Sequence, residues 1–128
     1  MIVVRTPHDD LFNYAECEEM YNQNKELIGD DGFRDVVKRT FFYSFSEWNT
    51  GEFLGCIYYY YRNDGRLFLN AFAGRKHHLL NLECLKKSLT WFDCDIYAET
   101  KHKTAKLCLL KCGFEKLEND IYIYRRKK

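Results

Sequence analysis

A run of basic and titratable side chains directly follows an apolar segment in the middle of the chain. It comprises Arg75, Lys76, His77 and His78, and it starts after Gly74. The segment before it has the composition of a strand, and the residues after it have the pattern of a helix. Such a junction presents free backbone amides and a partial positive charge. The pattern fits two interpretations equally: a site that holds a diphosphate group with basic side chains, and an exposed helix start whose bases face water.

Six cysteines are the second candidates for chemistry. They are Cys17, Cys56, Cys84, Cys94, Cys108 and Cys112. We interpret them as buried free thiols and expect no bound metal, because a chain of this size can form a core without disulfides. Cys108 and Cys112 are spaced as neighbours on one helical face, so a metal site with a histidine is the alternative. We find no nucleophile triad, Walker-type loop or paired-carboxylate motif.

The composition predicts one folded domain over residues 1–128. Of these residues 46% are hydrophobic and 17% are aromatic, with one proline, so a hydrophobic core is expected and long disordered tracts are not. No apolar run approaches the roughly 20 residues that cross a bilayer. The N-terminus lacks a signal-peptide pattern. We therefore expect a cytoplasmic protein without a membrane span.

The charge is divided unevenly along the chain. Residues 1–35 carry nine acidic and three basic side chains, and residues 36–128 carry seventeen basic and ten acidic ones. A cationic surface on the C-terminal part would suit the phosphates of a cofactor or of a nucleic acid. A solvated lysine-rich exterior is the alternative. No nucleic-acid-binding signature is recognisable, so we do not expect that partner.

The hydrophobic pattern predicts a mixed α+β domain. Strands are expected at residues 2–5, 40–46, 52–62, 66–73, 95–100, 114–117 and 121–124, and helices from residue 9 or 10 to about 20, at 33–38, at 76–92, and from a cap at Thr104 to Gly113. Turn sequences at 49–51 and 63–65 join three strands into an antiparallel meander. A long helix followed by a strand then implies a crossover within the same sheet.

The order of these elements, and the segment before the last hairpin, resemble the GNAT superfamily of N-acetyltransferases over nearly the whole chain. In many members the last helix reads approximately Asn-x-x-Ala-x-x-x-Tyr-x-Lys-x-Gly-Phe, and the residues that match in register are Ala105, Lys111, Gly113 and Phe114. His102 stands where the pattern has asparagine. Leu109 stands where it has the tyrosine that often serves as general acid. The resemblance implies a central mixed sheet of six or seven strands flanked by about four helices.

The resemblance also implies acetyl-CoA as cosubstrate, held where the fourth strand of the family's sheet meets the long helix. Members usually carry Gln/Arg-x-x-Gly-x-Gly/Ala at this junction, and here only Gly74 matches that pattern. The cofactor-binding residues implied at this junction are Ala71, Phe72, Ala73, Gly74, Arg75, Lys76, His77 and His78.

An N-acetyltransferase needs a base for the proton of the attacking amine, and an acid can assist the leaving thiolate. Glu99 ends the strand before the last helix, and His102 follows it closely. Both are candidate bases, since histidine titrates near neutrality and a carboxylate can act directly or through water. Tyr97 is the candidate acid in place of the missing tyrosine. A structural role is the alternative for each of the three.

Two functional hypotheses follow from the resemblance. The first is transfer of an acyl group from acetyl-CoA to an unidentified amine or protein acceptor. The second is a GNAT-like domain without catalytic activity that binds protein partners in an assembly. Small domains with an altered cofactor loop resemble proteins carried by bacteriophages, which would place the chain in a virion or in the host cytoplasm. The two hypotheses differ in whether acetyl-CoA stabilises the folded protein.

Overall fold

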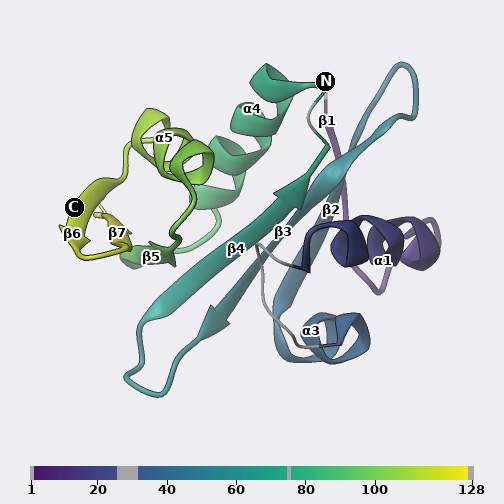
Figure 1. Ribbon diagram of the computed structural model, residues 1–128. Coiled ribbons are helices and arrows are strands. Elements are labelled where there is room, and N and C mark those ends of the chain that lie inside the picture. The colour runs from purple at the N-terminus through teal and green to yellow at the C-terminus, as the bar shows by residue number, and fades with distance from the viewer. Residues whose placement is uncertain (1, 26–31, 75, 127–128) are drawn as a thin grey trace.

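A computed structural model describes residues 2–25, 32–74 and 76–126, and within them the chain forms one mixed sheet (Figure 1). The strands are β1 (Ile2–Arg5), β2 (Phe41–Glu47), β3 (Phe53–Tyr61), β4 (Leu67–Ala73), β5 (Ile96–Glu99), β6 (Glu115–Glu118) and β7 (Ile121–Tyr124). The described helices are α1 (Tyr14–Gln23), α3 (Phe33–Arg39), α4 (His78–Leu89) and α5 (Lys103–Lys111). The strand order β1-β2-β3-β4-β5-β7-β6 confirms the predicted seven-stranded mixed sheet.

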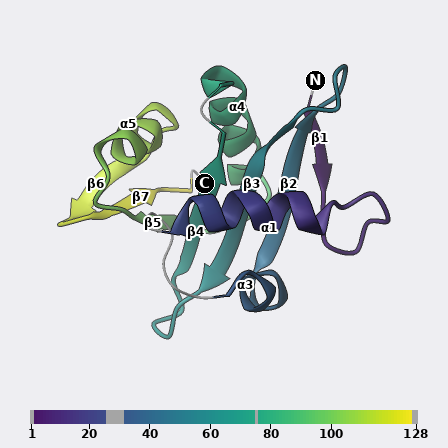
Figure 2. The same ribbon diagram turned by 45° about the vertical axis from the view of Figure 1, so that its right-hand side comes forward.

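The helices cover the sheet from both sides, with α1 and α3 on one face and α4 and α5 on the other (Figures 1 and 2). Side chains alternate between the faces of a strand, so β3 contributes to two separate cores. Cys56 and Tyr58 belong to the core under α1 and α3, whereas Ile57 and Tyr59 belong to the core under α4 and α5. Burial on both faces explains why this strand reads as a nearly continuous apolar and aromatic run.

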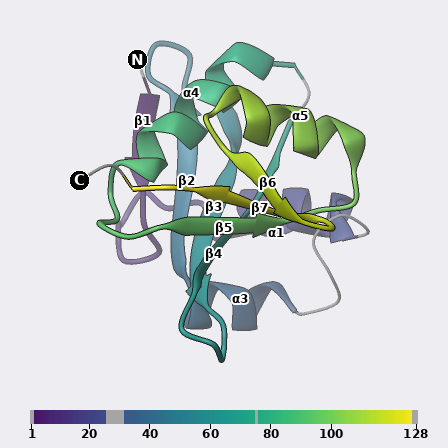
Figure 3. The same ribbon diagram turned by 90° about the vertical axis from the view of Figure 1, so that its left-hand side faces the viewer.

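The two edges of β4 are paired very differently. On one side β4 is antiparallel to β3 in continuous register from Gly55↔Ala73 to Tyr61↔Leu67. On the other side it is parallel to β5 only at Leu67↔Ile96 and Phe68↔Tyr97. Figure 3 shows β5 running across β4 rather than along it. The two strands therefore separate beyond Phe68, and among the described residues no strand pairs with the rest of β4 on that side.

Gly55 permits the close approach of β3 and β4 opposite this open edge. A Cβ built on Gly55 would lie 2.4 Å from the carbonyl oxygen of Phe72 and 2.7 Å from the Cα of Ala73. Any side chain here would meet backbone atoms, which cannot rotate away. Next to it, the β2–β3 register shifts between Phe45 and Ser46, as expected where a bulge re-aims a strand.

Three helices have boundaries that differ from the sequence prediction. The first helix begins only after Asn13, whose Oδ1 accepts a hydrogen bond from the Glu16 amide at 3.0 Å. Asp9 instead closes a turn by accepting from the Thr6 amide at 2.6 Å. Helix α4 is shorter than predicted at both ends, and α5 begins after His102 rather than after Thr104. Before the first helix several short polar side chains are suitable caps, and Asn13 is the one that makes the capping hydrogen bond.

Within the described ranges, no helix combines the length and the apolar character that crossing a membrane requires.

Candidate acyl-CoA site

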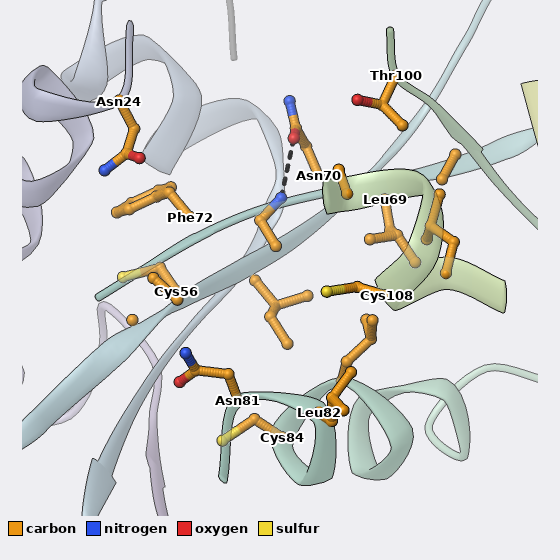
Figure 4. Close-up of a pocket in the computed structure, with 18 of the residues that line it drawn as sticks. Asn24, Cys56, Leu69, Asn70, Phe72, Asn81, Leu82, Cys84, Thr100 and Cys108 are labelled. Carbon is orange, nitrogen blue, oxygen red and sulfur yellow. Dashed lines mark hydrogen bonds between the residues drawn. The ribbon is translucent and has the colours of Figure 1, made fainter. Parts of the chain in front are cut away.

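A cavity of about 740 Å³ lies where β4 and β5 separate. Its walls come from residues 69–73 and Gly74, from Ala98 and Glu99 of β5, and from the facing sides of α4 and α5. Side chains of both cores border it, including Phe72 and Leu85. Figure 4 shows Asn81 and Leu82 of α4 and Cys108 of α5 directed toward this space. The cavity therefore forms directly from the loss of β4–β5 pairing.

The exposed edge of β4 presents backbone amides to this cavity. The Gly74 amide donates to the Leu54 carbonyl of β3 at 3.0 Å, and amide directions alternate along a strand. The amides of Ala71 and Ala73 therefore point away from β3, toward the side that β5 has left. Such a row of donors suits the carbonyl groups of an extended ligand that lies along the strand.

The helices that begin beside the cavity have uncapped N-termini. Neither α4 nor α5 has a capping side-chain hydrogen bond or an acidic residue in its first turn among the described residues. By contrast, α1 is capped by Asn13 and carries Glu16 in its first turn. Free amides and the helix dipole favour an anion. The Asn81 Nδ2 group donates to the Gly74 carbonyl at 2.7 Å and ties the junction to α4.

The basic residues of the junction have unequal positions. His78 lines the cavity and is exposed, whereas Arg75 lies outside the described residues. His77 Nε2 donates to Glu52 Oε2 at 2.7 Å, and Lys76 Nζ lies 3.6 Å from Glu52 Oε1. The hydrogen bond from His77 lowers the pKa of the Glu52 carboxyl. Glu52, which is distant in sequence, therefore already pairs with two of the side chains predicted to bind phosphate.

The structure brings two of the three candidate catalytic side chains to the cavity. Glu99 and His102 both line it. The Glu99 carboxylate accepts a hydrogen bond from Arg62 at 3.0 Å, which fixes its orientation. Tyr97 is not among the lining residues. Its ring stacks on Phe68 with centroids 5.5 Å apart.

Three cysteines contribute thiols to the cavity wall, namely Cys56, Cys84 and Cys108. Burial raises the pKa of the Cys84 thiol to about 12, and it also raises that of Cys56. These two thiols are therefore protonated at neutral pH and pack as small apolar groups. All six cysteines are free, but the prediction that they are buried holds for only four of them, because Cys94 and Cys108 are half-buried. No metal-binding group of three or more His, Cys, Asp or Glu side chains exists among the residues that the structure describes.

The chain resembles known proteins in its three-dimensional structure. No protein-family model matches the sequence, and no curated protein matches it. Among solved structures, a GNAT-family acetyltransferase from Staphylococcus aureus Mu50 is similar, with a TM-score of 0.64 and 16% identity, over 99% of this chain and 100% of that one. The aminoglycoside acetyltransferase AAC(6')-Ib, solved with coenzyme A, has a TM-score of 0.70 and 16% identity, over 98% of this chain and 95% of that one.

The fold is that of the GNAT acetyltransferases. N-acetylglutamate synthase from Neisseria gonorrhoeae, solved with coenzyme A and N-acetylglutamate, is also similar, with a TM-score of 0.70 and 10% identity. The match covers 100% of this chain and 36% of that one. The resemblance read from the sequence is thus confirmed as a GNAT fold. These similar structures support an acetyltransferase-like fold, and they give no support to a bacteriophage or virion origin.

Several lining residues of this GNAT-fold cavity escaped the sequence prediction. Asn70 is the one polar residue of β4. A polar residue inside an otherwise apolar strand was the sequence feature that could have identified it as a site residue. Asn81 and Cys108 lie on helices whose cavity-facing side could not be known before α4 and α5 were placed. Leu109, at the position of the family tyrosine, is buried and also lines the cavity.

Proposed function

We propose that the chain is an N-acetyltransferase that binds acetyl-CoA in the cavity between β4 and β5. The observation that carries this proposal is the unpaired edge of β4. The amides of Ala71 and Ala73 face a hollow with room for an extended, amide-containing arm. The coenzyme A named in two of the similar structures supports the choice of ligand. It adds to the geometry of this chain and does not replace it.

In this proposal the diphosphate lies at the N-terminus of α4. The uncapped amides of the first turn and the exposed His78 side chain offer donors there. Lys76 and His77 would exchange the Glu52 carboxylate for phosphate oxygens, which accept the same hydrogen bonds with more charge. Arg75 is included on sequence grounds alone. Side chains rather than a glycine-rich loop thus provide most of the binding.

Bound acetyl-CoA supplies a thioester carbonyl that an amine can attack. We assign Glu99 and His102 to removal of the amine proton, directly or through water, because both line the cavity. Arg62 orients the Glu99 carboxylate for this task. Tyr97 lies outside the lining, so proton donation to the leaving thiolate is not assigned to it.

Thermal unfolding with and without acetyl-CoA tests the proposal. A ligand at about 100 times its Kd stabilises the folded state by about 2.7 kcal/mol, so the Tm should rise. Cys108→Trp should abolish the rise by filling the cavity. The matched control is Leu107→Trp, a change at an exposed neighbour that does not line the cavity. Release of free CoA thiol with a panel of amines then tests transfer itself.

The outcome that contradicts the proposal is also simple. If millimolar acetyl-CoA leaves the Tm of the wild-type protein unchanged, the cavity does not bind it. If Leu107→Trp removes the rise as fully as Cys108→Trp does, the ligand binds elsewhere.

A further inference from the structure

Asn70 makes an unusual contact inside the proposed acyl-CoA site. Its Oδ1 accepts a hydrogen bond from the backbone amide of Ala71 at 2.9 Å (Figure 4). That amide is one of those on the open edge of β4. The side chain therefore caps a donor that the neighbouring strand would otherwise have paired.

The hydrogen bond of this cap is a modest one. An intramolecular hydrogen bond of this kind contributes about 0.5 to 1.5 kcal/mol net. Asn70 is half-buried, Ala71 is exposed, and both line the same cavity, so the Asn70 side chain competes for this amide with water and with any ligand in the cavity. The contact is held by side-chain torsions alone, and a rotation about them releases the amide without moving the strand.

Asn24 lies across the cavity from Asn70, at the C-terminal end of α1. Its Nδ2 donates to the Met20 carbonyl at 2.8 Å, and its Oδ1 is turned toward the cavity (Figure 4). Both carboxamides belong to the α1 side of the sheet, beside Phe72. A carboxamide freed from Ala71 would enter the space that Asn24 borders.

We propose that Asn70 is a displaceable cap that couples the two substrates of the proposed transferase. A carbonyl oxygen of the acyl-CoA arm replaces Oδ1 on the Ala71 amide. The released Asn70 carboxamide turns toward Asn24, and together they hydrogen-bond the amine acceptor. Acyl-CoA binding thus completes the acceptor site, and the two ligands bind with positive cooperativity. This inference rests on the proposed function, and in it Asn70 contacts the amine acceptor directly.

Two substitutions at this position should change acetyl-CoA affinity in opposite directions. Asn70→Ala removes the competing oxygen, so calorimetric titration should show acetyl-CoA bound about fivefold more tightly, the size of one net hydrogen bond. Asn70→Asp keeps the shape but offers a charged acceptor to the Ala71 amide, so binding should weaken by about the same factor. Amide hydrogen exchange of the free protein should be faster at Ala71 in Asn70→Ala and slower in Asn70→Asp.

A control variant separates the two substrates. Asn24→Ala should leave acetyl-CoA affinity unchanged and raise the KM for the amine about fivefold. Asn70→Ala should raise the same KM while it tightens acetyl-CoA. A merely structural role for Asn70 would weaken both ligands together.

Failure of the proposed function and failure of the role given to Asn70 would produce different results. If the wild-type protein does not bind acetyl-CoA, the proposed function is wrong and this inference goes with it. If the wild-type protein binds acetyl-CoA but the Ala and Asp variants shift its affinity in the same direction, or not at all, only the role of Asn70 is overturned.

Discussion

The two edges of β4 show how one strand serves both stability and binding. Its β3 edge is paired in register over the full length of the strand, from Leu67 to Ala73. Its β5 edge is paired only at Leu67 and Phe68, and the remainder borders a cavity. The closed edge holds the strand rigid enough for the open edge to present its amides in a fixed row. Changes at the closed edge should therefore affect folding, and changes at the open edge should affect ligands.

The largest expected effect comes from a change at the closed edge. Gly55→Ala places a methyl group 2.4 Å from the Phe72 carbonyl oxygen. It should lower the free energy of unfolding by about 3 kcal/mol, because overpacked backbone cannot relax without separating β3 from β4. Urea unfolding followed by circular dichroism measures this loss.

The same substitution at another glycine provides the control. In Gly32→Ala the new Cβ would have its nearest contact at 4.0 Å, with an Asp35 oxygen. This N-cap position should lose less than about 1 kcal/mol. Equal losses at the two glycines would mean that the tight β3–β4 approach does not decide stability.

A smaller effect is expected where β3 is joined to α4. Tyr59 is fully buried, and its hydroxyl shares a 2.7 Å hydrogen bond with Ser88 Oγ. Tyr59→Phe should cost about 1 kcal/mol of unfolding free energy, with Ser88 still donating to the Leu85 carbonyl. The exposed Tyr61 is the matched site, and Tyr61→Phe should be neutral. A neutral Tyr59→Phe would show that this bond does not stabilise the closed half of the sheet.

The smallest effect is expected at Glu52, which lies just before β3 and beside the junction at the open end. In the proposed site, Glu52→Gln should tighten acetyl-CoA binding, because Lys76 and His77 lose a carboxylate that competes with phosphate. The expected gain is about threefold, which is the size typical of a partly exposed ion pair. Calorimetric titration at neutral pH measures the change. Weaker binding in this variant would show that Glu52 positions these residues instead of competing for them.

The same pair has a defined pH dependence. Because His77 lowers the pKa of Glu52 below its ordinary 4.5, the pair stabilises the folded protein above that pH. This contribution disappears as the pH falls through the lowered pKa of the folded state. Any difference in urea stability between wild type and Glu52→Gln should therefore shrink as the pH falls below 4.5 and vanish below the lowered pKa of the folded state. A difference that persists there would have another origin.

Much of the fold could be predicted from local patterns. The strand at Ile121–Tyr124 has the predicted bounds. Each end of β2, β3 and β4 lies within one residue of its predicted position. Alternating burial and the glycine turns at 49–51 and 63–65 fix such boundaries locally. The start of α1 was wrong because Asp9, Asp10 and Asn13 are all good caps, and only tertiary packing distinguishes them.

The site was less accessible because its contacts are made between distant segments. Glu52 meets His77 only after the β2–β3 hairpin reaches the start of α4. The stacking of Tyr97 on Phe68 depends on the short parallel register of β4 and β5. Asn70 gains its importance from an edge that β5 fails to cover. No local pattern encodes which strand loses its neighbour.

The hollow between β4 and β5 is bordered by side chains from both cores, and this has a kinetic consequence. Phe72 stands on one side of the sheet and Leu85 on the other. In the proposed transferase, lining from both faces of the sheet lets a thioester and an amine occupy this cavity together. Neither product has to depart before the second reactant arrives. Double-reciprocal plots of the reaction should therefore give lines that intersect and do not run parallel.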